Sequence, residues 1–165
     1  PGVIALRGSC RNIQDGLALS LEVSNLSDQV WENVRGGVCV QLAAATDFVD
    51  LALARTFFAV DGRLVPVSQP ASRGGPTPHH PPRPAPTENF MAVASRPEGY
   101  VIAQWWEGNP FGVGGNCHPS IACIHAPPAM GDLQPGGSAT RSGRLYMMPG
   151  SAHDAYERFL NETGR

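Results

Sequence analysis

Two cysteines, two histidines and an asparagine lie within one short segment, Asn116–His125, where the sequence concentrates side chains that can do chemistry. Histidine titrates between about pH 5 and 8, so His118 and His125 are candidates for a general acid and base or for metal ligands. Three hypotheses follow from this segment. It forms a polar binding pocket with Asn116, it holds a metal, or it is a loop closed by a disulfide between Cys117 and Cys123.

The spacing of these residues differs from that of a structural zinc site. Such sites usually have two to four residues between the cysteines and three to five between the histidines. Here five residues separate Cys117 from Cys123, and six separate His118 from His125. The spacing therefore argues against a structural zinc site. Copper or zinc bound through His118 and His125 is still one of the three hypotheses.

A second metal hypothesis uses Cys123, His125 and Met130, together with His79 or His80. Two histidines, one cysteine and a weak methionine are the ligands of a blue-copper centre. In this respect the segment resembles cupredoxins, which are also β-sandwiches. Cupredoxins place at least two residues between the cysteine and the following histidine, whereas one residue intervenes here. On a strand, this spacing directs Cys123 and His125 to the same face.

The four cysteines form an even set, Cys10, Cys39, Cys117 and Cys123. An even number of cysteines in a chain rich in proline and glycine is typical of exported, disulfide-bonded proteins. The simplest pairing is Cys10 with Cys39 and Cys117 with Cys123. We therefore expect a secreted or periplasmic protein, and the alternative is a cytosolic chain with four free thiols.

Trp105 and Trp106 precede a glycine-rich loop, and strand alternation sends neighbouring side chains to opposite faces. At most one of the two indoles then belongs to the core, and the other is a candidate platform for a sugar ring. Asn116 and Arg144 are candidates for hydrogen bonds to sugar hydroxyls. Asp132 is a candidate catalytic carboxylate beside His118 or His125, with Glu107 as another nearby carboxylate.

Composition disfavours several classes of partner and mechanism. Only 16% of the residues are charged and the net charge is -2, so the chain has no electrostatic footprint for nucleic acid. The chain has no run of about 18 apolar residues, so the sequence predicts no membrane span. The chain contains no lysine, which excludes a lysine nucleophile. No serine lies in a nucleophile-elbow motif, so a histidine is the better candidate for a general base.

Period-two alternation and turn residues predict the elements that position these groups. Leu17, Leu19, Leu21 and Val23 alternate with small or polar residues, and Asp61-Gly62 is a strong two-residue hairpin signal. The turn at 25–28 predicts a second hairpin-like pair. Strands are predicted over 17–24, 30–33, 37–43, 57–60, 63–67, 90–95, 100–106 and 138–148, and a helix over 152–160 with Ser151 as its N-cap.

This pattern predicts an all-β protein, an antiparallel β-sandwich with a short C-terminal helix, as a single domain over residues 1–165. The proline-rich segment 68–87 lacks hydrophobic periodicity and is predicted to be a long insertion loop within that domain. Because it carries His79 and His80, it is a candidate lid over a site.

The segment from Tyr100 to Gly150 resembles part of a group of uncharacterised exported bacterial proteins linked to polysaccharide use. Its motifs are YVIAQWWEGNP, NCHP, ACIHAPPAMGDLQPG and RSGRLYMMPG. It also resembles the closing part of galactose-mutarotase-like β-sandwiches. The resemblance implies that Asn116, His118 and His125 line a carbohydrate-facing pocket. The phrase LALSLEVSN at 17–25 resembles immunoglobulin-like adhesion modules, which would imply no active site.

The resulting prediction is an exported, carbohydrate-associated protein. It binds or processes an oligosaccharide or polysaccharide in a pocket lined by tryptophan, asparagine and histidine. The alternatives are a non-catalytic secreted interaction or assembly module, and a copper- or zinc-binding β-sandwich protein. Oligomeric state, and whether the protein is an enzyme, stay open.

Overall fold

A seven-stranded antiparallel sheet organises the molecule, in the order β1-β2-β13-β9-β8-β5-β6. The computed structural model describes residues 3–67, 79–80 and 84–165. The elements of this large sheet are β1 (Ile4–Ile13), β2 (Gly16–Asn25), β5 (Thr56–Val60), β6 (Arg63–Pro66), β8 (Phe90–Ala94), β9 (Tyr100–Trp106) and β13 (Ser138–Pro149).

Two smaller sheets complete the β-structure of the described residues. The first has four strands in the order β4-β11-β10-β7, and the second pairs β12 with β3. Their bounds are β3 (Trp31–Arg35), β4 (Cys39–Gln41), β7 (His79–His80), β10 (Gly114–Asn116), β11 (Cys123–His125) and β12 (Ala129–Leu133). The helical elements are the short 3-10 helix η1 (Thr46–Phe48) and the C-terminal helix α1 (Ala152–Thr163).

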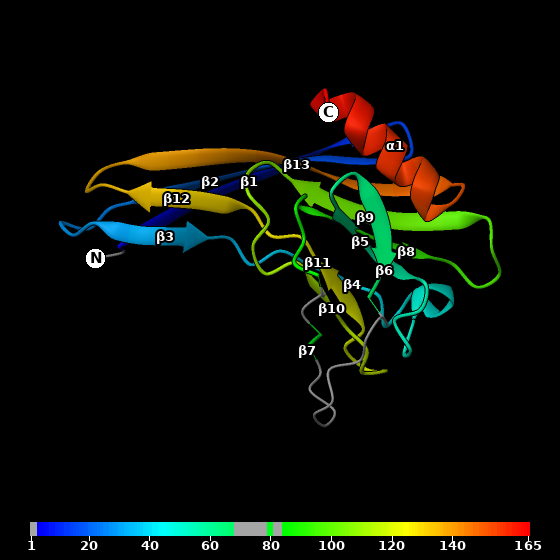
Figure 1. Cartoon of the computed structure of the whole chain (residues 1–165). Coiled ribbons are helices and arrows are strands. Elements are labelled where there is room, and N and C mark those ends of the chain that lie inside the picture. The colour runs from blue at the N-terminus through cyan, green and yellow to red at the C-terminus, as the bar shows by residue number, and fades with distance from the viewer. Residues whose placement is uncertain (1–2, 68–78, 81–83) are drawn as a thin grey trace.

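Alternation along the strands decides what packs on each face of the large sheet. On β9, Ala103 and Trp105 belong to a core cluster that includes residues of α1. Ile102, the residue before Ala103, belongs to a second cluster, shared with Ile124 of β11. Figure 1 shows the result: α1 lies on one face of the large sheet, and β4, β10 and β11 lie on the other. The predicted β-sandwich with a short C-terminal helix is confirmed.

Some strand pairings differ from the sequence-based expectation. β2 pairs with β1 and β13, while β3 pairs with β12, so the turn after Asn25 does not form a hairpin. The Asn25 side chain is buried and donates to the carbonyls of Gln29 and Leu133, which ties the end of β2 to a segment distant in sequence. The hairpin at Asp61-Gly62 is confirmed, because β5 and β6 pair directly.

Segment 37–43 differs from the prediction, whereas segment 68–87 is described only in part. A buried strand was expected at 37–43, but β4 is short, and Cys39 and Gln41 at its ends are exposed. Most of the proline-rich segment lies outside the described residues. Within it, His79 and His80 form β7, which pairs with β10. Among the described helices, none is long and apolar enough to cross a membrane.

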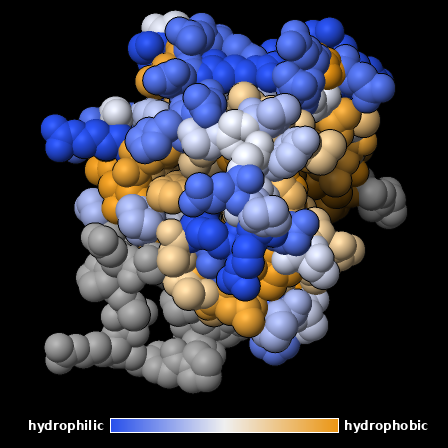
Figure 2. Space-filling view, turned by 90° about the vertical axis from the view of Figure 1, so that its right-hand side faces the viewer, coloured by the Kyte–Doolittle hydropathy of each residue, from blue (hydrophilic) through white to orange (hydrophobic). Residues whose placement is uncertain are grey.

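Large hydrophobic side chains also reach the surface. Leu6 on β1, Tyr100 on β9 and Met147 on β13 are each more than half exposed. On the face seen in Figure 2, hydrophobic areas are interrupted by hydrophilic side chains. Scattered hydrophobic exposure of this kind is normal for a protein surface. Cavities are therefore the better guide to a binding site.

Helix α1 begins with a capping box, as the sequence predicts for Ser151. The Ser151 hydroxyl accepts from the Asp154 N–H at 3.3 Å, and the Asp154 carboxylate accepts from the Ser151 N–H at 2.6 Å. We expect Ser151→Ala to lower the free energy of unfolding by about 1 kcal/mol in urea denaturation. Ser138→Ala, at an exposed serine that begins β13, is the control, and equal losses for both variants would contradict the cap's role.

The same cap gives a pH dependence with a defined sign. Hydrogen bonds from Ser151 lower the pKa of Asp154 below its ordinary value. The stabilisation is therefore present at neutral pH, above the unfolded-state pKa of about 3.9, and is lost as the pH falls through the folded-state pKa. The difference in stability between the native protein and Ser151→Ala should shrink accordingly in acid.

Candidate functional site

Trp105 begins a hydrogen-bonded chain on the helix-bearing face of the large sheet. Its indole N–H donates to the Tyr146 hydroxyl at 2.7 Å, and that hydroxyl donates to the Glu162 carboxylate at 3.0 Å. Phe159 of α1 packs edge-on against the indole, with ring centroids 5.5 Å apart. Residues of β9, β13 and α1 thus fix one another's side chains in a buried corner beside the helix.

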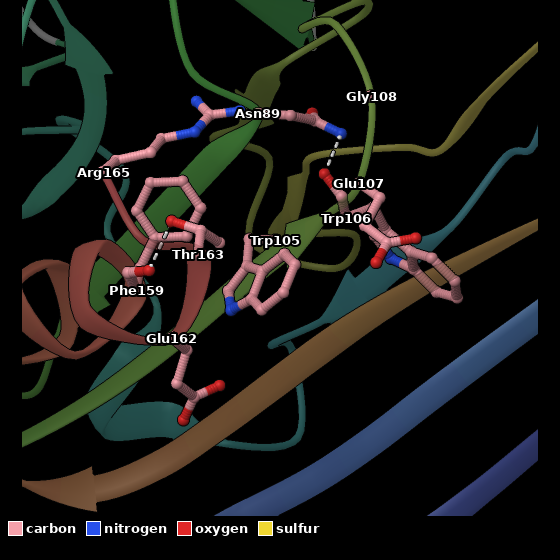
Figure 3. Close-up of a pocket in the computed structure, with 9 residues that line it drawn as sticks. All are labelled: Asn89, Trp105, Trp106, Glu107, Gly108, Phe159, Glu162, Thr163 and Arg165. Atoms are coloured by element: carbon pink, nitrogen blue, oxygen red, sulfur yellow. Dashed lines mark hydrogen bonds between the residues drawn. The ribbon is translucent and has the colours of Figure 1, made fainter.

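Two cavities adjoin at this corner, and both are lined by Trp105, Glu107 and Glu162. Figure 3 shows the first, with Trp105 between the two carboxylates and Phe159 on the helix beside it. Its volume is about 300 Å³, and that of the second is about 470 Å³. These volumes are in the range of small-molecule sites in proteins. We call the two cavities together the Trp105 hollow.

The second cavity opens over a polar part of the same sheet face. Helix α1 packs mainly on β8 and β9 and reaches β13 at Arg144 and Tyr146, and the second cavity extends from there over β2 and β1. Opposite residues in an antiparallel pair share a face, and the register pairs Ser142 with Ser20, and Ser20 with Ser9. All three serines line the second cavity. In the next row on the same face, Arg144 lies opposite Ala18, and Ala18 lies opposite Arg11.

The charged groups of the hollow are held by specific contacts. The Arg144 Nε lies 3.3 Å from the Glu162 carboxylate, and its guanidinium centre is 5.5 Å from the Trp105 ring. Arg158 holds the other Glu162 oxygen at 2.9 Å. The Glu107 carboxylate accepts from the backbone N–H of Ser142 at 2.9 Å.

Tyr146 links the indole to these charges as a neutral hydroxyl. Burial raises the pKa of Tyr146 well above its ordinary value, the hydrogen bond from Trp105 opposes this rise, and the nearby Glu162 carboxylate adds to it. A protonated hydroxyl can donate to Glu162 while accepting from Trp105. The pair of hydrogen bonds therefore persists across the neutral pH range.

Three of the predicted ligand-binding residues line the Trp105 hollow: Trp105 lines both cavities, Arg144 the second and Trp106 the first, although the ring of Trp106 turns away. Trp106 points to the opposite face of the sheet, where Gly143 makes room for its ring: a Cβ at Gly143 would lie 2.5 Å from the ring. Both indoles are only 4% exposed, so neither is the open stacking platform that the sequence suggested. Arg141 lies three positions before Arg144 on β13, which places it on the opposite face, and it donates to carbonyls of β12.

The other predicted residues lie away from the Trp105 hollow. Asn116 accepts from the backbone N–H of His118, and the His118 ring lies 2.7 Å from the Ser120 hydroxyl in an exposed turn. Asp132 accepts from the N–H of Asn33 and so joins β12 to β3. Among the residues that line the two cavities, none is Asn116, His118, His125 or Asp132.

All four cysteines are free thiols in the structure, so the expected pairs Cys10 with Cys39 and Cys117 with Cys123 are not formed. Cys10 lines the second cavity on β1, while Cys39 lies on β4 next to β11. There the register pairs Cys39 with His125, whose Nε2 is 3.1 Å from the sulfur of Cys39 and 3.1 Å from that of Cys123. Strand pairing, which the sequence spacing does not reveal, decides these neighbours.

The cluster of Cys39, Cys123 and His125 differs from both metal sites considered from the sequence. Cys123 and His125 share a face, as predicted from their spacing, but Met130 is buried in a separate cluster with residues of β2. Burial, followed by the neighbouring Cys39 thiol, raises the pKa of Cys123 to about 12. In the structure this thiol is therefore protonated at neutral pH.

No protein-family model matches the chain, and no curated protein matches it in sequence. Among solved structures, a polysaccharide lyase superposes with a TM-score of 0.54 at 11% identity, over 98% of this chain and 22% of the lyase. The similarity is one of fold. The chain spans less than a quarter of that protein.

Two further solved structures have lower scores. A galactose mutarotase-like protein from Clostridium acetobutylicum is 10% identical, with a TM-score of 0.49 over 89% of this chain and 56% of its own. An alpha-N-acetylgalactosaminidase from Bifidobacterium bifidum is 15% identical, with a TM-score of 0.47 over 98% of this chain and 31% of its own.

Proposed function

We propose that this chain is a carbohydrate-binding β-sandwich unit of an exported protein, and that it binds an oligosaccharide in the Trp105 hollow. The observation that carries the proposal is the pair of adjoining cavities that share Trp105, Glu107 and Glu162. The name of the polysaccharide lyase with a similar fold supports a saccharide as the ligand class. The serines of β1, β2 and β13 extend the hollow into a polar groove.

The side chains of the hollow have the hydrogen-bonding chemistry that sugar hydroxyls require. A guanidinium donates in a planar fork, a carboxylate accepts, and both hold neighbouring hydroxyls in pairs. Arg11 and Arg144 balance Glu107 and Glu162 in charge within the second cavity. Because neither sign of charge dominates in the second cavity, the proposed ligand is an uncharged oligosaccharide rather than a polyanion.

A panel of polysaccharides tests the ligand class. Native gel electrophoresis of the purified chain, with a neutral or an acidic polysaccharide cast into each gel, measures retardation relative to a gel without polysaccharide. We expect retardation by at least one neutral polysaccharide, which free oligosaccharide of the same type reverses. If no neutral member of the panel retards the chain, the proposal is wrong, and a protein-binding module becomes the better account.

A further inference from the structure

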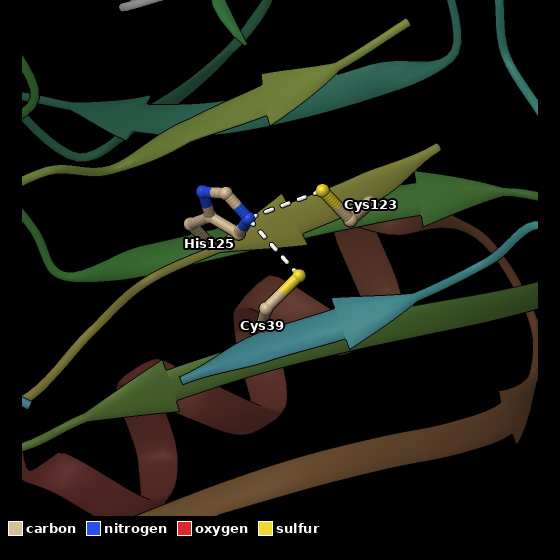
Figure 4. Close-up of side chains that lie close together, drawn as sticks. All are labelled: Cys39, Cys123 and His125. Atoms are coloured by element: carbon tan, nitrogen blue, oxygen red, sulfur yellow. Dashed lines mark hydrogen bonds between the residues drawn. The ribbon is translucent and has the colours of Figure 1, made fainter. Parts of the chain in front are cut away.

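A second cluster lies on the opposite side of the large sheet from the Trp105 hollow. Ile124 is buried between the β4-β11-β10-β7 sheet and the large sheet, so its strand neighbours Cys123 and His125 point to the outer face. Cys39 pairs with His125 across the strands and shares that face. Figure 4 shows both sulfur atoms next to the same imidazole nitrogen, and the three ligand atoms all lie within 4.8 Å of one another.

We propose that Cys39, Cys123 and His125 bind one zinc ion. Two thiolates and one imidazole are common zinc ligands, with Zn–S near 2.3 Å and Zn–N near 2.0–2.1 Å. Tetrahedral coordination at these bond lengths places the ligand atoms about 3.5–3.8 Å apart. The imidazole nitrogen now lies 3.1 Å from each sulfur, so it needs to move outward by only a few tenths of an ångström.

The backbone fixes the three positions before any ion binds. Cys123 and His125 are two residues apart on β11, and β4 holds Cys39 opposite His125 through the strand register. On binding, each thiol releases its proton to water and the sulfur becomes the ligand, while the imidazole binds through Nε2. The exchange of two protons for one Zn²⁺ involves no oxidation or reduction.

A separate cavity beside the cluster leaves a coordination position of the proposed zinc open. Its volume is about 220 Å³, and it is lined by Cys39, His125 and Pro127 together with the glycines Gly36, Gly37 and Gly112. Cys39 itself is exposed, which gives the ion a path from solvent. Three protein ligands with a fourth position open to water or substrate are the pattern of catalytic zinc sites, whereas structural zinc has four protein ligands.

Zinc titration of the reduced, chelator-stripped protein against a chromophoric zinc indicator tests the site. We expect one zinc per chain, with an affinity that falls about a hundredfold or more in Cys39→Ser, because one of three protein ligands is lost. Cys39 is the residue to change, since Cys123 is buried and its replacement risks the fold. The matched controls are Cys10→Ser and Cys117→Ser, which should keep the native affinity.

A cobalt-substituted sample gives a second readout. Sulfur-to-cobalt charge-transfer absorption should appear in the native protein and weaken in Cys39→Ser. Equal zinc affinity in the native protein and Cys39→Ser, or no zinc uptake by protein with four titratable thiols, would overturn the proposal. A disulfide between Cys39 and Cys123 in freshly isolated, unreduced protein, detected by mass spectrometry, would overturn it as well. Glycan binding should be unchanged in Cys39→Ser, so the two proposals fail independently.

Discussion

Arg144→Ala is expected to weaken oligosaccharide binding about tenfold to a hundredfold, because it removes a charge-assisted hydrogen-bond donor worth about 1.5–3 kcal/mol from the Trp105 hollow. The fold should tolerate the change. The pair that Arg144 makes with Glu162 is partly exposed, with the arginine side chain 25% accessible, and such pairs contribute about 1 kcal/mol or less. Isothermal titration calorimetry with an oligosaccharide chosen from the polysaccharide panel measures the loss.

Two further variants show whether the geometry of Arg144 matters. Arg144→Lys keeps the charge but lacks the planar fork, so its affinity should lie between those of the native protein and the alanine variant. Arg63→Ala removes an exposed arginine from β6, at the far edge of the same sheet, and should bind like the native protein. The same affinity in the native protein and Arg144→Ala would remove Arg144 from the site.

Phe159→Ala is expected to lower the free energy of unfolding by about 3–5 kcal/mol, the usual cost of removing a buried phenylalanine. Phe159 is 2% exposed and joins α1 to the large sheet, with ring centroids 5.2 Å from Phe90 and 5.5 Å from Trp105. Its loss leaves a cavity beneath the helix that also widens the first cavity of the Trp105 hollow. Urea denaturation monitored by far-UV circular dichroism measures the effect.

Phe111 provides a control of the same residue type. It is 43% exposed, and its ring contacts the guanidinium of Arg35. An exposed cation-π contact contributes about 0.5–1 kcal/mol, so Phe111→Ala should cost about 1 kcal/mol or less. Comparable losses for the two variants would show that α1 is not anchored through Phe159.

The sequence predicted those parts of the fold that depend on neighbouring residues. Alternation over Leu17 to Val23, the Asp61-Gly62 turn and the Ser151 cap are local signals, and each corresponds to an element of the structure. Strand β1 was not predicted separately. Its residues are almost all exposed along the edge of the sheet, so burial imposes little pattern on them.

Strand order explains what the sequence could not predict about the sites. Cys39 and His125 meet across β4 and β11 although 86 positions separate them. Glu162 reaches Arg144 only because α1 packs back on the sheet, and the helix sequence does not indicate that contact. Both tryptophans are buried because each face of the large sheet is covered at β9, whereas alternation alone suggested that one of them would be open.

Nuclear magnetic resonance of the indole groups can show whether an oligosaccharide binds in the Trp105 hollow. The chain has three tryptophans: Trp105 and Trp106 line the first cavity, and Trp31 lies on β3 in a different sheet. In ¹⁵N-labelled protein titrated with the selected oligosaccharide, we expect the Trp105 indole N–H signal to shift progressively while that of Trp31 stays in place. A shift confined to Trp31, or an unmoved Trp105 signal at a ligand concentration that saturates binding by calorimetry, would contradict this expectation.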